Sequence, residues 1–207
     1  IVTFNSELSI GNALRSLDCY MPSNMAPRMI IVDNASMDDT AAIVENFSRT
    51  NPNISFIRNT KNVGFGQAHN QALAISESRY HIICNPDIIV SSDVFSPLAA
   101  LLDRYPDIAI ACPQFRYTNG ELQPLNRHHP TVIDLLLRRL PAKLTGPLFK
   151  RRLEHYDMRD IGYERSYDVP FVSGAFMFCR TRVLKEIQGF DERFFLYFED
   201  ADLSRRV

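Results

Sequence analysis

The chain has 207 residues, of which 45% are hydrophobic and 23% charged, and its formal net charge at pH 7 is -1. This length and composition predict one large globular domain and exclude an intrinsically disordered chain. The near-neutral charge excludes a generally basic nucleic-acid-binding protein, and no apolar run approaches the roughly 20 residues that a membrane span needs. The 4 widely spaced cysteines predict reduced thiols in a cytoplasmic protein.

In the first half of the chain, short β-branched runs alternate with segments of helical spacing. We expect strands over residues 1–4, 28–32, 54–58, 80–84 and 108–112, and helices over 8–17, 40–47, 68–75 and 94–102. Strands separated by crossovers of helical length are typical of a mostly parallel sheet with helices on both faces. Residues 1–113 are therefore expected to form a Rossmann-like α/β half.

The second half, residues 114–207, has a different pattern. Asn119-Gly120 lies between two short extended runs and predicts a β-hairpin. A strand over 168–179 and a helix over 181–187 follow, and the last residues have the pattern of a further helix. The chain does not begin with methionine and stops within that pattern, so we expect the sequence to be trimmed at both ends.

Residues 127–165 interrupt this pattern as a basic insertion. They hold nine Lys and Arg against five Asp and Glu, mixed with apolar residues and three prolines. One interpretation is an amphipathic element that lies on an anionic membrane, at the inner face of the plasma membrane. The other is a helical insertion packed on the sheet with a solvated basic face. The sequence leaves both open.

Polar residues follow each of the first four expected strands. Ligands of open parallel sheets bind beyond the carboxyl ends of the strands, so these residues are candidates for one site. Asp33 and Asn34 would accept hydrogen bonds from a nucleoside, or else cap the next helix. Phe4 would stack on a base or belong to the core. Gly64 lies in a turn where a glycine lets the backbone approach a phosphate or a sugar.

Two acidic motifs add candidates for chemistry. Asn85-Pro86-Asp87 follows the fourth strand and suits Mg²⁺ or Mn²⁺ held together with a diphosphate, although an Asx-type turn is the alternative. Glu199, Asp200 and Asp202 follow an aromatic run at an expected helix start. They indicate a general base, or acids that only favour the helix dipole.

Together these motifs resemble the family-two inverting glycosyltransferases of the GT-A fold, in particular the rhamnosyltransferase-like branch. The matching segments are residues 1–5, 32–36, 62–70, 85–87, 173–176, 189–191 and 199–203. The resemblance implies an α/β GT-A fold: a Rossmann-like, mostly parallel central sheet with helices on both faces and a smaller acceptor-side sheet. It also implies one domain over 1–207, with a nucleotide-sugar-binding half (1–113) and an acceptor-side half (114–207).

The same resemblance implies an activity and its participants. A sugar, rhamnose in this branch, would pass from a nucleotide-diphosphate donor to a saccharide or lipid-linked saccharide in cell-surface polysaccharide synthesis, with Mg²⁺ or Mn²⁺ as cofactor. From its charge we expect no nucleic-acid partner, and in the membrane interpretation the insertion 127–165 would provide peripheral membrane contact.

Site residues follow from the motifs by the same resemblance. Asp200, with Glu199 beside it, matches the catalytic base; Asp87 and Asn85 match the metal motif; and Gly174 and Asp202 fall on the acceptor side. The residues expected to bind the nucleotide sugar are Thr3, Phe4, Asn5, Asp33, Asn34, Asn62, Gly64, Phe65 and Asn70.

Two other functions are compatible with an α/β nucleotide-binding half. A sugar-phosphate nucleotidyltransferase would need a glycine-rich, basic loop after the first strand, where this chain has Asn5-Ser6-Glu7. A non-catalytic sugar-nucleotide-binding module would bind the donor without forming a product.

Overall fold

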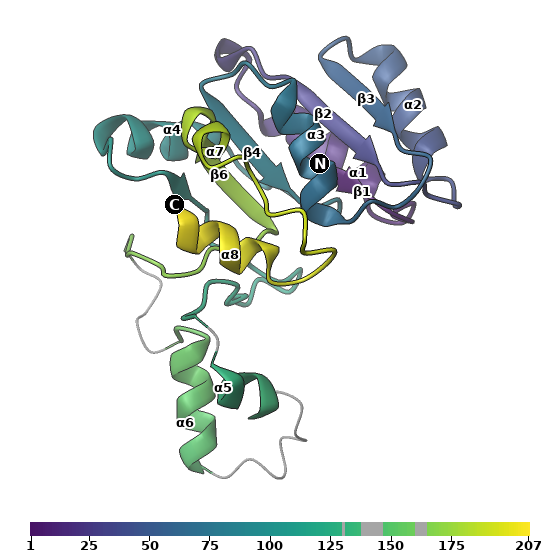
Figure 1. Cartoon of the computed structure of the whole chain (residues 1–207). Helices are drawn as coiled ribbons and strands as arrows, with labels where there is room; N and C mark the ends of the chain where they lie inside the picture. Colours follow the sequence, from purple (N-terminus) through teal and green to yellow (C-terminus); the bar gives the residue numbers. More distant parts are fainter. Residues whose placement is uncertain (130, 138–146, 160–164) are drawn as a thin grey trace. The chain divides into compact units, whose positions relative to one another are not determined.

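The computed structural model describes residues 1–129, 131–137, 147–159 and 165–207 (Figure 1). The chain forms two compact units: Ile1–Pro113 with Gly174–Val207, and Gln114–Ser173. The first unit therefore combines the beginning and the end of the chain. Every site residue predicted from the sequence lies in it.

A parallel sheet of three strands organises the start of the first unit. Its order is β1 (Val2–Thr3), β2 (Met29–Asp33) and β3 (Ile54–Arg58). The crossovers contain α1 (Ile10–Tyr20), the short 3₁₀ helix η1 (Ser23–Met25) and α2 (Thr40–Thr50). Because the strands are parallel, their carboxyl ends lie at one edge, as the sequence predicts.

The apolar core explains why these segments take these forms. On α1 the buried residues recur with helical spacing, at Ile10, Ala13, Leu14 and Leu17. On α3 (Phe65–Ala74), Ala68 and Ala72 are one turn apart and pack on Val2 and Val32 of the sheet. The small alanines let this helix lie close to β1 and β2.

A second sheet is antiparallel, with the order β4 (Tyr80–Cys84), β6 (Phe176–Arg180) and β5 (Ile110–Ala111). The α/β prediction is confirmed, but β4 and β5 do not extend the parallel sheet. Both pair with β6, and the expected strand over 168–179 begins only at Phe176. α4 (Phe95–Arg104) connects β4 to β5, while α7 (Thr181–Glu186) and α8 (Glu199–Arg206) follow β6.

The second unit contains the predicted hairpin and two helices. Arg116 and Leu122 form an antiparallel bridge, and Gly120 takes the left-handed conformation at φ 85°. Asn119 has no positive φ, so the turn is not of type I′, in which both central residues do. The helices are α5 (Val132–Leu137) and α6 (Pro147–Tyr156).

Parts of the basic insertion, residues 138–146 and 160–164, lie outside the described residues. Within the described part of the chain, no helix is long and apolar enough to span a bilayer. None of the four cysteines, all of which lie among the described residues, forms a disulfide. Burial raises the pKa of the Cys84 thiol to about 12, so that group is neutral.

Candidate active site

The first part of the candidate site lies where β1 and β2 end. The parallel register places Thr3 beside Asp33, and the Thr3 hydroxyl donates to Asp33 Oδ1 at 3.0 Å. Ser36 donates to the same carboxylate through its hydroxyl at 2.5 Å and its backbone N–H at 3.2 Å. Asp33 is fully buried, so its carboxylate holds the turn after β2. A helix cap is not its role here, because α2 begins seven residues later.

Asn5 connects the loop after β1 to the same turn. Its backbone N–H donates to Ser36 Oγ at 2.8 Å, and its side-chain oxygen accepts from the Met37 N–H at 2.9 Å. Its own backbone is left-handed, at φ 50°, a conformation that asparagine tolerates better than most residues. The ring of Phe4, 45% exposed, is not part of the core and is accessible to a ligand.

Asn34 links the ends of β2 and β3. Its side-chain nitrogen donates to Gly64 O at 3.0 Å, and its oxygen accepts from Asn59 Nδ2 at 2.9 Å and from the Val63 N–H at 3.3 Å. Asn62 shapes the same turn by accepting the Gly64 N–H at 2.9 Å. A buried amide with these partners sets the course of residues 59–64 relative to the sheet edge.

Gly64 lets the segment before α8 approach closely. Its φ is 93°, and a Cβ placed there would lie 2.6 Å from Phe195 O. The next N–H, from Phe65, donates to that carbonyl at 3.0 Å. The glycine therefore joins the turn after β3 to the aromatic run before Asp200.

Gly174 brings Asp200 to the end of β4. Its N–H donates to Asp200 Oδ2 at 3.0 Å, and the next residue, Ala175, accepts the Asn85 N–H at 2.9 Å. A Cβ on Gly174 would lie 3.4 Å from Asp200 Cβ and 3.5 Å from the Phe65 ring. β6 is antiparallel to β4, so its start meets the end of β4 at this edge.

The residues after β4 suit a metal ion only in part. Asp87 is exposed and Asn85 half-buried, so their side-chain oxygens offer one carboxylate and one amide. No three His, Cys, Asp or Glu side chains of the described residues come together as a metal cage would require. This donor set fits Mg²⁺ or Mn²⁺ that takes most of its ligands from a diphosphate and water.

Glu199 differs from its neighbour Asp200 in environment. Its side chain is 5% exposed, and Oε2 has no hydrogen-bond partner among the described residues. Burial, followed by the nearby Asp200 charge, raises the pKa of Glu199. Asp200 is half-buried, and its Oδ1 accepts the Ala201 N–H at 2.9 Å. Of the two acids, Asp200 is the more accessible.

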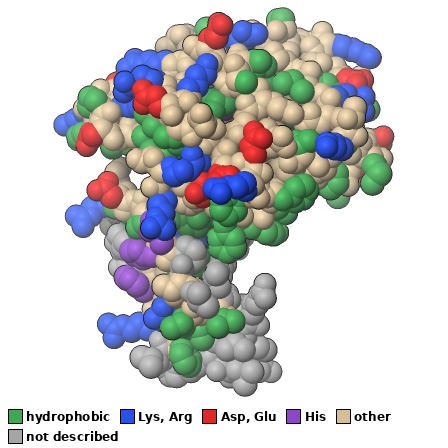
Figure 2. Space-filling model, viewed as in Figure 1, with side chains coloured by type: hydrophobic (Ala, Val, Ile, Leu, Met, Phe, Trp, Pro, Cys, Tyr) green, Lys and Arg blue, Asp and Glu red, His purple; other side chains and the backbone are tan. Residues whose placement is uncertain are grey.

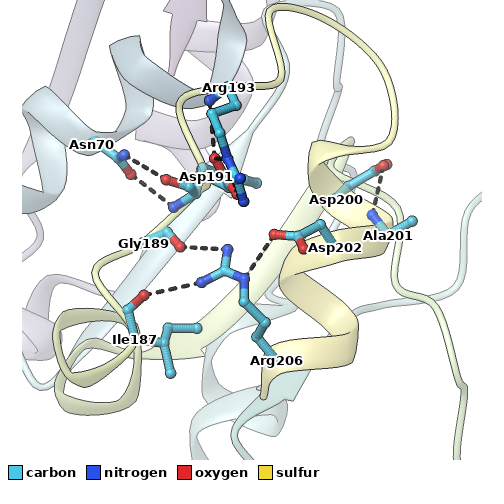
Figure 3. A network of polar contacts seen from close by, with 10 residues as sticks. Asn70, Ile187, Gly189, Asp191, Arg193, Asp200, Ala201, Asp202 and Arg206 are labelled. Carbon is cyan, nitrogen blue, oxygen red and sulfur yellow. Dashed lines mark hydrogen bonds and ion pairs between the residues drawn. The ribbon is translucent and has the colours of Figure 1, made fainter.

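A polar network holds α8 in place (Figure 3). Arg206 donates to Asp202 Oδ2 at 2.7 Å, to Ile187 O at 3.0 Å and to Gly189 O at 2.8 Å. The Asp202 carboxylate, in the first turn of α8, is thus engaged by a guanidinium from the last turn. This guanidinium fixes the end of the helix that begins with Glu199 and Asp200.

The amide of Asn70, on α3, is the second anchor of this region. It accepts the Phe190 N–H at 2.9 Å and donates to Phe190 O at 2.9 Å and to Glu192 Oε1 at 3.1 Å. These bonds hold the turn between α7 and α8 against α3. They occupy the amide that the sequence assigns to nucleotide-sugar binding.

Four residues that shape this site were not among the predicted site residues, although Ser36 lies in the motif 32–36 and Asn59 among the polar residues after the third strand: Ser36, Asn59, Phe195 and Arg206. Arg206 lies four residues after Asp202, a spacing that would have predicted their ion pair. Ser36 bonds to Asp33 only three residues before it, whereas the contacts of Asn59 and Phe195 join segments that only the tertiary fold brings together. No pattern in the sequence indicates them.

Known proteins resemble the chain in sequence and in fold. N-acetylglucosaminyl-diphospho-decaprenol L-rhamnosyltransferase of Mycobacterium tuberculosis (strain CDC 1551 / Oshkosh) is 28% identical over 192 residues, which cover 86% of this chain and 60% of that protein. The chain thus spans less than two thirds of this relative.

Two solved structures share the fold. TarS 1-349 of S. aureus in complex with UDP-GlcNAc has a TM-score of 0.66 at 22% identity, covering 99% of this chain and 51% of that one. Mannosyltransferase PcManGT from Pyrobaculum calidifontis, in complex with GDP-Man and Mn²⁺, has a TM-score of 0.65 at 18% identity, covering 99% and 48%. These neighbours confirm the GT-A fold expected from the sequence.

The family comparison covers most of the chain. Residues 1–188 match the family described as glycosyl transferase family 2. That range includes the ends of β1, β2, β3 and β4 and the Gly174 segment, whereas α8, which begins at Glu199, lies beyond it. The chain belongs to glycosyl transferase family 2.

Proposed function

We propose that this chain is the catalytic part of an inverting glycosyltransferase. It transfers a sugar from a nucleoside-diphosphate donor to a hydroxyl of a saccharide acceptor, and it works in the cytoplasm on cell-surface polysaccharide. The rhamnosyltransferase relative supports rhamnose as the sugar and a lipid-linked saccharide as the acceptor. The neighbours solved with UDP-GlcNAc and with GDP-Man and Mn²⁺ support a nucleotide sugar and a divalent cation.

One observation carries this proposal. The Gly174 N–H donates to Asp200, and the adjacent Ala175 carbonyl accepts from Asn85, so two hydrogen bonds connect the carboxylate on α8 to the end of β4. The metal motif and the candidate base come from distant parts of the sequence. Their proximity is what a reaction between a diphosphate sugar and a hydroxyl requires.

The chemistry assigns Asp200 the role of general base. Its carboxylate removes the proton of the acceptor hydroxyl while that oxygen forms a bond to the anomeric carbon. The bond from that carbon to the diphosphate oxygen breaks on the opposite face, so the nucleoside diphosphate leaves and the configuration inverts. Gly174 orients the carboxylate through its N–H, and the neighbouring Glu199 is buried, with a raised pKa.

Residues at the ends of the strands would bind the metal ion and the donor. Asp87 and Asn85 would hold Mg²⁺ or Mn²⁺ together with the diphosphate, where such an ion stabilises the charge of the leaving group. The exposed ring of Phe4 would stack on the base. Thr3, Asn5, Asp33 and Asn34 would support the nucleoside side, and Asn62, Gly64 and Phe65 the diphosphate-sugar side.

Calorimetric titration with UDP, GDP and dTDP sugars, with and without Mn²⁺, followed by product detection, tests the proposal. Asp200→Asn should lower turnover by about 10²–10⁴-fold and leave donor affinity nearly unchanged. Asp107→Asn, an exposed acid between α4 and β5, is the matched control and should retain turnover. Near-normal turnover of Asp200→Asn would exclude the base role.

The same titration separates the other functions. Formation of a nucleotide sugar from a sugar phosphate and a nucleoside triphosphate would indicate a nucleotidyltransferase. Donor binding with no product from any acceptor would indicate a binding module. Either result would overturn the proposal.

A further inference from the structure

The second unit places exposed apolar and basic side chains on the same pair of helices. α5 and α6 contact each other, and in Figure 2 green and blue side chains lie together over this part of the surface. The unit Gln114–Ser173 has ten Lys and Arg against seven Asp and Glu in its sequence. The rest of the chain has thirteen Lys and Arg against seventeen Asp and Glu. The formal net charge is therefore positive in this unit and negative in the rest of the chain.

An ion pair with a buried carboxylate fixes how the two helices face each other. Asp134, 4% exposed, accepts from the Thr131 N–H and hydroxyl at the start of α5, as in a capping box. The same carboxylate accepts from Arg152 Nε of α6 at 2.7 Å, and Arg152 Nη2 donates to Thr131 Oγ1 at 2.9 Å. These contacts turn the Asp134 side of α5 toward α6.

The other side of α5 consequently faces solvent with apolar side chains. Ile133 and Leu136, three residues apart, are 53% and 60% exposed, whereas Asp134 and Leu137 are buried. On α6, Phe149 is 42% exposed and is followed by exposed Lys150 and Arg151. Arg151 has no hydrogen bond or ion pair with any residue that the structure describes, and Lys150 has only a 3.9 Å contact with Glu154.

We propose that Ile133, Leu136, Phe149, Lys150 and Arg151 form a docking surface for an anionic lipid bilayer. Apolar side chains would enter the boundary between headgroups and acyl chains, while the flanking cations stay at the phosphates. Charge complementarity favours a lipid bilayer as the binding partner, because exposed cationic side chains beside large apolar ones match a negatively charged leaflet. The surface would bring the enzyme to an acceptor that is itself anchored in lipid, a link that rests on the proposed function.

Co-sedimentation with vesicles tests the surface itself, in the absence of donor and acceptor. The chain should bind vesicles of phosphatidylcholine with phosphatidylglycerol, bind those of phosphatidylcholine alone far less, and detach as NaCl rises. Lys150→Gln with Arg151→Gln should weaken binding about 25-fold, at about fivefold for each charge. Arg182→Gln with Lys185→Gln on α7, both exposed, is the matched control and should bind normally.

A second pair of variants tests the apolar side chains. Ile133→Ser with Leu136→Ser should reduce vesicle binding at least tenfold, since two large side chains no longer enter the bilayer. Ile75→Ser with Ile89→Ser, which have the same exposed fractions of 53% and 60% in the other unit, should leave it unchanged. Circular dichroism of all variants checks that the helices persist.

Three outcomes would overturn the proposal: no vesicle binding, binding independent of lipid charge, or equal effects of the variants and their controls. A dimer that the Ile133→Ser with Leu136→Ser pair converts to monomers would instead assign the surface to self-association. Because the vesicle assay needs no sugar transfer, its result is independent of whether the proposed activity is correct.

Discussion

Arg206→Met tests whether the end of α8 sets the position of Asp200. The substitution keeps most of the length of the side chain and removes the guanidinium that joins Asp202, Ile187 and Gly189. α8 spans only eight residues, so its packing and these bonds, rather than its own helical propensity, keep it in place. Losing them should free the helix at its last turn.

The size of the effect follows from the contacts. Hydrogen bonds to a charged group contribute about 1.5–3 kcal/mol each, and the Arg206 and Asp202 side chains are 30% and 26% exposed. Water replaces part of what is lost, so the free energy of unfolding should fall by about 2–3 kcal/mol. A shift of about 1 Å in a reacting group costs about 100-fold in rate, so kcat should fall by about 10–100-fold.

The assay compares Arg206→Met with Arg205→Met, an exposed neighbour on the same helix. Urea unfolding gives the change in stability, and transfer kinetics give kcat and the donor KM. We expect kcat to fall for Arg206→Met alone, with the donor KM little changed, because the donor is held by the strand ends. Equal kcat values for the two variants, despite a loss of stability in one, would refute the positioning argument.

Three further perturbations have defined outcomes. Gly64→Ala should lower the free energy of unfolding, measured in urea, by about 2 kcal/mol, because φ is 93° and the new Cβ would lie 2.6 Å from Phe195 O. A variant as stable as the wild type would contradict this close contact between Gly64 and Phe195. Asp134→Asn should speed amide exchange in α5 and α6 alone, since it breaks the ion pair with Arg152. Unchanged exchange would show that this ion pair does not hold the two helices together. Burial lowers the pKa of His81 from 6.5 to about 4, so its neutral form stabilises the fold near neutral pH, and stability falls as pH drops through this range. At pH 4 the loss from this group approaches about 3 kcal/mol; His81→Phe should unfold with a shallower dependence on pH, and an unchanged dependence would exclude His81 as a source.

Local patterns predicted most of the first unit. The expected strands over 54–58 and 80–84 coincide with β3 and β4, and the expected helix over 40–47 lies within α2. Apolar runs bounded by polar turns carry this information in a few neighbouring residues. The direction of pairing was harder, because β4 pairs with a strand more than ninety residues away and its sequence names no partner.

The candidate site divides in the same way. Asp33, Asn34 and Asp87 could be found from the sequence because they lie at or just after the ends of β2 and β4. The hydrogen bond from Thr3 to Asp33 depends on a contact across a crossover, so the sequence did not indicate it.

The end of the chain illustrates the limit most clearly. Residues 199–203 indicated a helix start with a general base, and α8 does begin at Glu199. What orients Asp200 is the N–H of Gly174, a residue with no side chain to signal such a role. The network of Arg206 likewise uses two backbone carbonyls, which every residue has.

The central claim is that the end of β4 and the start of α8 face one donor diphosphate. Paramagnetic broadening of amide signals by Mn²⁺, with UDP, GDP or dTDP present, measures this most directly. The account predicts that broadening depends on the nucleotide and centres on the amides of Asp87, Gly174 and Asp200, while those of α2 stay sharp. Broadening centred away from these three amides, or identical without nucleotide, would contradict it.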